Sequence, residues 1–272
     1  MSLSSVSDAT TLLFVPGSRP DRFAKAAEST ADGIIIDLED AVADTDADVA
    51  LAHTVDALSS GTVSAIVRVR AASDVRHATQ VRSLAHLPGL IGIMVAKADD
   101  EGTLQEIAQL VPEHVAIVPL VESAVGLSRC ENLAAVPGVS RLAFGSIDYS
   151  LDIGAEHAAA PMAYARSRLV NASRAAGIRP PLDAPSVEIS NTAAVEDQAR
   201  RARAFGFGGM LAIHPGQLSA IRSGFAPTDA ELTWARRVLS ADGASAQVAG
   251  QFVDLPVAER ARWTLSRAEN SA

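Results

Sequence analysis

Two acidic residues, each at the end of a hydrophobic segment, are the features of this sequence that most directly suggest chemistry. Glu122 follows the run VAIVPLV, and Asp148 ends the segment SRLAFGSID. Near-continuous apolar runs are typical of parallel strands that are covered on both faces, so each carboxylate is expected to leave the carboxyl end of a buried strand. Carboxylates from successive strands can converge on a hard divalent cation, which prefers oxygen ligands. The pair therefore predicts a metal-dependent enzyme.

The elements that would position these residues alternate along the chain. Short β-rich runs are separated by longer amphipathic patterns, several of which end in glycine, as helices often do. The candidate strands are 12–15, 33–37, 65–69, 90–95, 116–121, 140–144, 179–182 and 209–213. Eight strands alternating with helices predict an α/β fold, the (β/α)8 TIM barrel. The seventh strand has the weakest pattern, because Pro180 and Pro181 cannot both serve a sheet ladder.

Three parts are expected along the chain: a disordered N-terminus at residues 1–10, the barrel at 11–224, and a C-terminal helical extension or lid at 225–272. In the last part, TDAELTWARRVLSAD predicts a helix capped by Thr228 or Asp229, and PVAERARWTLSRA predicts a final helix with Pro256 in its first turn. A complete barrel does not need this tail. The pattern leaves open whether the tail is a packing flap or a functional lid.

The composition argues against several functional classes. A chain of 272 residues, 48% of them hydrophobic, suits one large α/β domain. A net charge of -9 without a Lys/Arg stripe argues against a nucleic-acid partner. No apolar run approaches the roughly 20 residues that span a bilayer, and the N-terminus lacks a signal-peptide pattern. We therefore expect a cytoplasmic protein with no membrane partner. Cys130, the single cysteine, is interpreted as a buried, inert thiol.

Nearly every predicted strand delivers an ionisable residue to one face of the barrel. Active sites of such barrels lie at the carboxyl ends of the strands. In strand order, the residues found there are Arg19; Asp37, Glu39 and Asp40; Arg68 and Arg70; Lys97; Glu122; Asp148; Asp183; and His214. This concentration at one end of the barrel indicates an active site.

Several of these residues also have structural interpretations. Arg68 can pair with a carboxylate inside the barrel, and Lys97 can be a solvated loop lysine. His214 precedes Pro215, so it can orient its neighbours or close a helix rather than transfer protons. These alternatives stay open from the sequence alone.

The segments after the first two predicted strands also allow both a structural role and a role in the site. Asp37 and Asp40 can cap the helix that follows, which leaves Glu39 as the better candidate to point into the site. The turn GSRPDR precedes a helix and offers backbone N–H groups, together with Arg19, to an anion. As a motif, this turn is weak by itself.

Several segments of the sequence together resemble a known family. The segments LLFVPGSRPDRFAKA, ADGIIIDLEDAV, VESAVGL, LAFGSIDYSLDIG, LAIHPGQL and FAPTDAELTWARRVL are similar to the citrate lyase β-subunit/malyl-CoA lyase family of the HpcH/HpaI aldolase superfamily. The resemblance runs from about residue 11 to the last helix. It implies a TIM barrel, usually a homo-oligomer and often a trimer, that binds Mg²⁺. The implied reaction cleaves or forms a carbon–carbon bond in an acyl thioester, with an oxoacid and acetyl-CoA as the other partners.

The resemblance also implies roles for individual residues. The metal carboxylates of the family fall on Glu122 and Asp148, and its oxoacid-binding arginine falls on Arg68. The acidic residues that hold metal-bound waters fall on Glu39 and Asp40.

Further implied roles concern the carrier and the lid. Arg19 lies where the family contacts the phosphates of the thioester carrier. The segment FVDLP places Asp254 where a lid aspartate of relatives reaches a neighbouring subunit's site, which favours a lid for the tail. We count Asp37, Lys97 and His214 as further substrate-binding candidates.

Departures from the family pattern leave the substrate open. Relatives commonly have Asn where Arg70 stands, Pro-Lys where this chain has Ala96–Lys97, and a lysine where Gly209 stands. Citramalyl-CoA, malyl-CoA and citryl-CoA all remain candidates. The alternatives are a carrier-free, metal-dependent oxoacid aldolase of the pyruvate type, or a degenerate barrel that binds without catalysis. Retention of both metal carboxylates and the oxoacid-binding arginine argues against the degenerate barrel.

Overall fold

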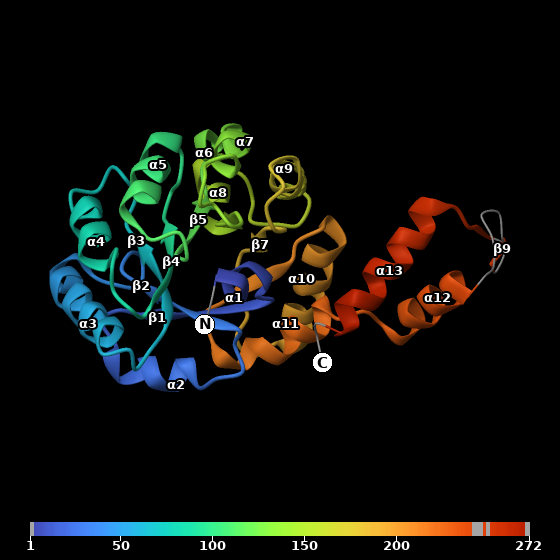
Figure 1. Cartoon of the computed structure of the whole chain (residues 1–272), viewed down its shortest axis with the longest axis horizontal. Coiled ribbons are helices and arrows are strands. Elements are labelled where there is room, and N and C mark those ends of the chain that lie inside the picture. The colour runs from blue at the N-terminus through green and yellow to red at the C-terminus, as the bar shows by residue number, and fades with distance from the viewer. Residues whose placement is uncertain (1–2, 241–246, 249–250, 270–272) are drawn as a thin grey trace.

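Eight parallel strands close into a barrel in this computed structural model, which describes residues 3–240, 247–248 and 251–269 (Figure 1). The strands follow one another around the barrel in chain order, and β8 pairs with β1 to close it. They are β1 (Thr11–Pro16), β2 (Gly33–Asp37), β3 (Ala65–Val69), β4 (Leu90–Val95), β5 (Ala116–Val121), β6 (Ala143–Phe144), β7 (Leu182–Asp183) and β8 (Gly209–Ala212). The predicted (β/α)8 barrel is confirmed.

Most helices connect successive strands and form the outer layer of the barrel, whereas the first helix precedes β1 and the last of the barrel helices follows β8 (Figure 1). They are α1 (Leu3–Asp8), α2 (Phe23–Ala27), α3 (Ala47–Ser59), α4 (His77–Leu84), α5 (Glu101–Leu110), α6 (Ala124–Ser128), α7 (Cys130–Ala134), α8 (Ser146–Asp152), α9 (Ala163–Ala175), α10 (Thr192–Phe205) and α11 (Leu218–Phe225), with short 3-10 turns η1 (Pro20–Arg22), η2 (Asp44–Asp46) and η3 (Pro215–Gln217). Cys130 is buried, as predicted. None of the described helices combines the length and the apolar character that crossing a membrane requires.

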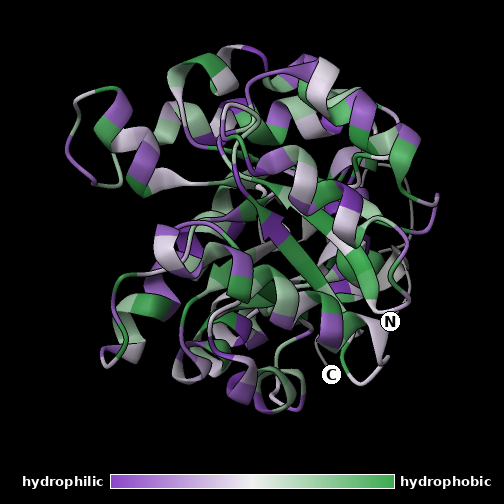
Figure 2. Ribbon diagram, turned by 90° about the vertical axis from the view of Figure 1, so that its left-hand side faces the viewer, coloured by the Kyte–Doolittle hydropathy of each residue, from purple (hydrophilic) through white to green (hydrophobic). Residues whose placement is uncertain are grey.

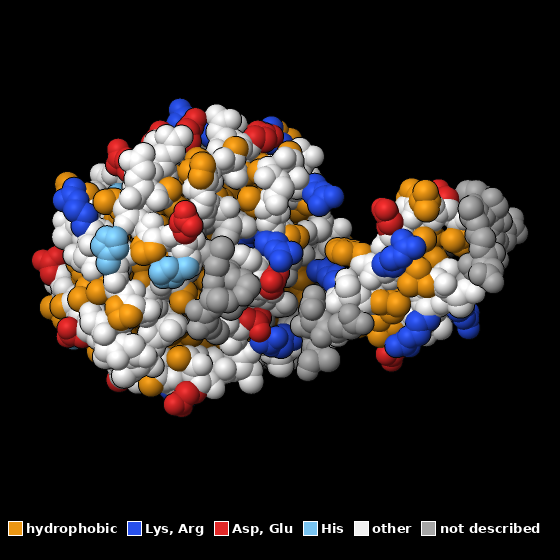
Figure 3. All heavy atoms as spheres, in the orientation of Figure 1, with side chains coloured by type: hydrophobic (Ala, Val, Ile, Leu, Met, Phe, Trp, Pro, Cys, Tyr) orange, Lys and Arg blue, Asp and Glu red, His pale blue; other side chains and the backbone are white. Residues whose placement is uncertain are grey.

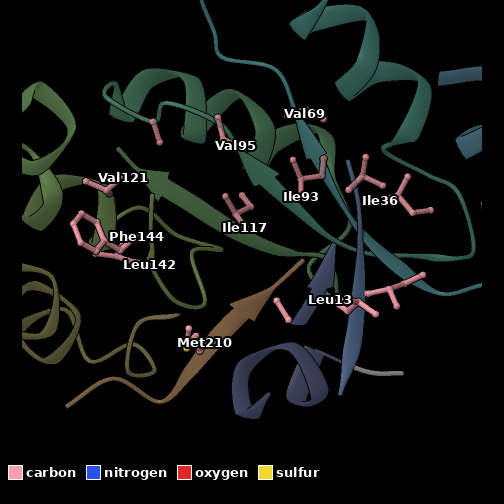
Figure 4. Close-up of a cluster of buried hydrophobic side chains, with 14 of the residues drawn as sticks. Leu13, Ile36, Val69, Ile93, Val95, Ile117, Val121, Leu142, Phe144 and Met210 are labelled. Carbon is pink, nitrogen blue, oxygen red and sulfur yellow. The ribbon is translucent and has the colours of Figure 1, made fainter. Parts of the chain in front are cut away.

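Alternation along the strands builds two hydrophobic layers. Successive side chains of a strand point to opposite faces. One set therefore packs between strands and helices, where Leu13, Ile36 and Ile117 lie (Figure 4), and the other set fills the barrel interior. The strands at the centre of Figure 2 are accordingly the most hydrophobic part of the molecule, whereas the helices have mixed surfaces.

The same alternation positions the polar residues of the site. The interior layer contains Ile35 on β2 and Ile66 on β3. Two residues further along each strand, Asp37 and Arg68 therefore face the interior at the carboxyl end, and both line the cavity there. Strand periodicity thus places charged groups directly above an apolar layer.

Helix α1 closes the amino-terminal end of the barrel and corrects one expectation. Residues 1–10 were predicted to be disordered, but Leu3–Asp8 form a helix, and residues 1–2 lie outside the described part. Val6 and Ala9 join the interior hydrophobic layer. The buried guanidinium of Arg141 donates hydrogen bonds to the Val6 and Ala9 carbonyls, at 3.3 and 2.7 Å. A helix of one to two turns is stable only through such tertiary contacts, which sequence periodicity does not reveal.

The tail forms a separate helical hairpin of α12 (Asp229–Ser240) and α13 (Leu255–Glu269), with a two-stranded antiparallel sheet of β9 (Gln247–Val248) and β10 (Gln251–Phe252). Thr228 caps α12: its hydroxyl accepts from the Glu231 N–H, and its own N–H donates to the Glu231 carboxylate. Trp234, Val253 and Leu265 belong to a small cluster packed between the two helices. The predicted terminal helices are confirmed.

The hairpin projects away from the barrel (Figures 1 and 3). The Arg203 guanidinium on α10 lies 2.8 Å from the Glu231 carboxylate on α12, and Arg267 on α13 donates to the Phe207 carbonyl at 3.4 Å. No described tail residue is among those that line the central cavity. Within one chain, the described part of the tail therefore does not line its own site.

Candidate active site

A cavity of about 370 Å³ opens at the carboxyl ends of the strands. Side chains from β1, β2, β3, β5, β6 and β8, and from the segments that follow the strands, line it. They are Phe14, Pro16, Asp37, Asp40, Ala41, Arg68, Leu120, Glu122, Phe144, Gly145, Ser146, Ile147, Asp148, Ala184, Pro185, Leu211 and Ile213. Five residues predicted from the sequence, four acids and one arginine, thus meet in one cavity.

Glu122 and Asp148 reach this cavity from neighbouring strands. Glu122 directly follows β5 and is buried, and Asp148 lies in the first turn of α8, just after β6. Gly145 between them is a steric requirement: a Cβ at this position would overlap the Glu122 carboxylate and lie 2.6 Å from the Glu122 Cβ. The glycine of FGSID therefore makes room for the acid on the neighbouring strand, a role that sequence reasoning missed.

The protonation of Glu122 suits a cation site. Its pKa is raised to about 8, chiefly by burial and also by the nearby charges of Glu39 and Asp148, although the hydrogen bond from the Lys97 N–H and the charge of Arg68 act to lower it. A bound cation would reverse this penalty.

The number of carboxylates also fits Mg²⁺. Among the described residues, no group of three or more His, Cys, Asp or Glu is arranged to hold a metal ion. Mg²⁺ usually keeps several waters and binds through one or two protein carboxylates. Glu122 and Asp148 fit that requirement and would leave positions open for a substrate.

Arg68 lies at the centre of a network of ion pairs with three acids. Its Nε and Nη2 donate to the Asp37 carboxylate at 2.7 and 2.6 Å. Its Nη1 lies 3.1 Å from Glu39 and 3.3 Å from Asp40, and the guanidinium lies 4.8 Å from the centre of the Phe14 ring. Burial alone would lower the pKa of Arg68, but its bonds to Asp37 and the neighbouring acids raise it. The structural pairing considered for Arg68 is confirmed, and the side chain lines the cavity as well.

Lys97 connects the metal carboxylate to the acidic loop. Its backbone N–H donates to Glu122 at 2.6 Å, and its Nζ lies 2.7 Å from Glu39. The Glu39 side chain is largely buried, and burial raises its pKa even though Arg68 and Lys97 act to lower it. The sequence indicated a side-chain role for Lys97 but gave no sign of its backbone role.

Asp37 and Asp40 have different roles in the loop after β2. Asp37 accepts the backbone N–H groups of Glu39 and Ala41, both at 3.0 Å, so it shapes the turn after β2 as well as holding Arg68. Asp40 caps no helix and instead lines the cavity.

Seven predicted residues lie outside the cavity lining. Glu39, Arg70 and Lys97 line a neighbouring pocket, and the other four have local partners. Arg19 is paired with Asp21 at the surface, with a side chain 45% exposed. His214 accepts the Gly216 N–H and caps the start of η3, so it orients its neighbours rather than closing a helix. Asp183 is fully buried against Arg166 at 3.0 Å, so it is a core ion pair.

Asp254 is the fourth of these residues. Its carboxylate accepts the Val257 N–H at 3.1 Å at the start of α13. In this single chain, Asp254 thus acts as a helix cap on the projecting hairpin.

The closed barrel with converging carboxylates and an arginine at its carboxyl end defines a TIM-barrel enzyme. A family model for HpcH/HpaI aldolase/citrate lyase matches residues 10–215. The chain belongs to this family, as its motifs predicted, and it is a lyase.

Relatives support this placement over nearly the full length. A citrate lyase subunit beta-like protein of Mycobacterium tuberculosis is 35% identical over 272 residues, 94% of each chain. An L-malyl-CoA/beta-methylmalyl-CoA lyase of Cereibacter sphaeroides is 30% identical over 298 residues, covering 94% of this chain and 93% of the relative. The solved structure of CitE from M. tuberculosis with magnesium, acetoacetate and coenzyme A is 31% identical, with a TM-score of 0.86 over 97% of this chain and 99% of CitE.

Proposed function

We propose that this chain is a Mg²⁺-dependent carbon–carbon lyase that cleaves or forms a β-hydroxyacyl-CoA, with an oxoacid and acetyl-CoA as the other reaction partners. The observation that carries the proposal is the convergence of Glu122, Asp148 and Arg68 on one cavity. The relatives support it, because CitE binds magnesium, acetoacetate and coenzyme A, and another relative is a malyl-CoA lyase.

Glu122 and Asp148 would hold Mg²⁺ in this cavity. When bound, the cation supplies Lewis-acid stabilisation for the negative charges that develop on the substrate oxygens. A water held by Glu39 or Asp40 would serve as the base. This assignment follows from the family resemblance and from the position of both acids beside Arg68.

Arg68 binds the carboxylate of the oxoacid portion. Asp37 fixes the guanidinium through two hydrogen bonds, so the cation is oriented before the substrate arrives. Guanidinium groups have five N–H donors. Two of the Arg68 donors point at Asp37, and the donors on Nη1 point at Glu39 and Asp40. A substrate carboxylate that accepts two hydrogen bonds from Arg68 therefore displaces at least one of these acids.

The acid that protonates the acetyl-thioester enolate is Asp254 of a neighbouring subunit. In one chain, Asp254 lies outside the cavity, on a hairpin that projects from the barrel. The hairpin exposes Leu255 at 75% and Trp263 at 53%, which suits contact with another copy. This requires a homo-oligomer of at least two subunits, and the family suggests a trimer.

The cavity favours a substrate with one carboxylate and an apolar substituent at the carbinol carbon. Arg68 is the single Lys or Arg among the lining residues, and Phe14, Leu120, Leu211 and Ile213 form much of the remaining wall. A second substrate carboxylate would lack a cationic partner there. This favours citramalyl-CoA over citryl-CoA, with malyl-CoA lacking only the methyl group.

Arg19 is the residue proposed to contact the carrier's phosphates. It would have to release Asp21 to do so. A carrier-free oxoacid aldolase would not need this arginine, so dependence of activity on Arg19 separates the two functions.

A cleavage assay tests the proposal. The purified protein is mixed with citramalyl-CoA, malyl-CoA and citryl-CoA in parallel, with Mg²⁺ or EDTA, while oxoacid and acetyl-CoA release are followed. Metal-dependent cleavage, fastest with citramalyl-CoA, is expected. Inactivity on all three in a protein that binds Mg²⁺ would reject the thioester lyase.

A further inference from the structure

Arg70 is anchored at the end of β3, outside the cavity that Arg68 lines. Its backbone N–H donates to the Gln80 side chain at 3.0 Å, and its carbonyl accepts from the His77 Nδ1 at 2.7 Å. Both anchoring residues lie on α4 and are buried. The backbone of Arg70 is therefore fixed from the α4 side, and its side chain extends to the opposite side, toward the loop after β2.

The side chain of Arg70 contacts both ends of a short stretch of this loop. Its Nε donates to the Leu38 carbonyl at 3.2 Å, and its Nη2 donates to the Val42 carbonyl at 3.5 Å. Residues 39–41, which lie between these two carbonyls, contain two acids of the site, Glu39 and Asp40. A rigid, planar guanidinium that spans both carbonyls fixes the separation of the two ends of the acidic stretch.

Two carboxylates hold the guanidinium in this position. The Nη1 of Arg70 lies 2.8 Å from Asp44 and 3.0 Å from Asp74, and the side chain of Arg70 is only 12% exposed. Asp74 in turn accepts the Arg76 N–H at 2.8 Å, which fixes its own orientation. The charge of Arg70 is therefore balanced by residues outside the active site.

The acidic stretch depends on such support because it has no regular structure. Residues 39–43 lie between β2 and η2, outside any helix or strand. Arg68, which lines the cavity, lies 3.1 Å from Glu39, and Lys97 lies 2.7 Å from the same acid. Arg70 restrains the backbone at Leu38 and Val42, so the acids keep their position when a substrate competes for Arg68.

We propose that Arg70 is a positioning residue for the lyase reaction: it clamps the loop at Leu38 and Val42 and thereby sets Glu39 and Asp40 against Arg68. The inference rests on the proposed function for its catalytic consequence. The clamp itself is a property of the folded chain.

Three variants test the role of Arg70. Arg70→Gln removes the charge and cannot span both carbonyls, and Arg70→Lys keeps the charge without the planar fork. Arg76→Gln is the matched control, since Arg76 lies 3.6 Å from Asp44 and has no bond to Leu38 or Val42. We expect kcat to fall about 10²-fold in Arg70→Gln with little change in KM. Arg70→Lys should recover part of the loss, and Arg76→Gln should match wild type.

A double-mutant cycle separates positioning from general stability. If Arg70 acts through Glu39, the losses in kcat caused by Arg70→Gln and Glu39→Gln will not multiply in the double variant. Unchanged kcat in Arg70→Gln, or losses that multiply fully, would overturn the inference.

Hydrogen exchange tests the clamp independently of activity. In Arg70→Gln, the amides of residues 39–42 should exchange faster than in wild type, while those of the barrel strands keep their rates. Unchanged exchange in this loop overturns the clamp. A wild-type protein without lyase activity, combined with faster exchange in the variant, would reject the proposed function while supporting the clamp.

Discussion

The backbone N–H of Lys97 donates a 2.6 Å hydrogen bond to the carboxylate of Glu122. Lys97 has a φ of 48°, and it is the single non-glycine residue with positive φ in the described part of the chain. This conformation costs about 1–2 kcal/mol for a residue with a Cβ. Strain of this kind concentrates at functional sites, and here it directs an N–H group at a metal carboxylate.

Replacing Lys97 by Gly separates its backbone role from its side-chain role. Glycine adopts positive φ without strain, so the hydrogen bond to Glu122 and the affinity for Mg²⁺ should be retained. The ion pair with Glu39 is lost, so the rate of cleavage should fall. Calorimetric titration with Mg²⁺ measures the affinity for the cation, and a kcat measurement tests the expected fall in the rate of cleavage. Weakened Mg²⁺ binding would show that the side chain, rather than the N–H, supports Glu122.

Removing either metal carboxylate should abolish Mg²⁺ binding. Glu122→Gln and Asp148→Asn keep the size of each side chain, so the loss reports the charge and not the packing. We expect no saturable Mg²⁺ binding and nearly complete loss of activity, with the fold retained by circular dichroism. Wild-type turnover from either variant in Mg²⁺-replete buffer would refute the assignment.

Mg²⁺ affinity should depend on pH through Glu122. Its pKa is raised to about 8 without a cation, chiefly by burial, so below that pH the carboxyl carries a proton that Mg²⁺ must displace. Apparent affinity should therefore rise up to about tenfold per pH unit as the pH approaches 8, and level off above it. Titration at pH 7 in buffers of different ionisation enthalpy should show release of about one proton per Mg²⁺. No proton release would contradict the raised pKa.

The same pKa shift predicts a pH effect on the metal-free protein. The folded state binds the Glu122 proton more tightly than the unfolded state does, because its pKa rises from the ordinary glutamate value of 4.5 to about 8. The corresponding stability is present at low pH and is lost as the pH rises through that window. Glu122→Gln should lack this component, which thermal unfolding in EDTA at several pH values can measure.

The apolar wall of the cavity should control the choice among thioesters. Ile213 lines the cavity and is 45% exposed, so Ile213→Lys can add a cation without burying it. We expect the ratio of kcat/KM for citryl-CoA to that for citramalyl-CoA to rise about tenfold or more. Ile189→Lys is a matched control, because Ile189 is 46% exposed and does not line the cavity. Equal ratios in both variants would exclude Ile213 from substrate selection.

Asp254→Asn tests the tail without disturbing its helix. Asn caps a helix about as well as Asp, so the bond to the Val257 N–H survives the change. If Asp254 supplies a proton in a neighbouring subunit, kcat should fall about 10²-fold or more with little change in substrate binding. A monomer by sedimentation, or unchanged kcat, would leave the tail without a catalytic role.

Residue types at strand ends predicted much of this site because strand geometry fixes side-chain direction. Asp37, Arg68 and Glu122 lie in or directly after regular strands, so the alternation of the strand determines that they face the cavity. Residues in longer connections were not predictable in this way. Arg19 and His214 also follow strands, yet local partners turn them away from the cavity.

Other features depend on contacts between distant parts of the sequence. Gly145 is required by an acid on the neighbouring strand, and α1 is held by Arg141, more than 130 residues away in the chain. Asp183 was expected at the active end but is neutralised by Arg166 in the core. A linear pattern carries no information about such pairings, although each uses residue types that the sequence displays.

Closure of the amino-terminal end of the barrel by α1 has a consequence for proton exchange during the reaction. Val6 and Ala9 pack into the amino-terminal end of the barrel, and the cavity lies at the opposite, carboxyl end of the strands. The substrate enters through the opening at the carboxyl end. Cleavage leaves an enolate that takes one proton from exchangeable groups, so one deuterium is expected in the acetyl methyl group when the reaction runs in heavy water. A second deuterium would show that the enolate forms again before acetyl-CoA leaves through this opening.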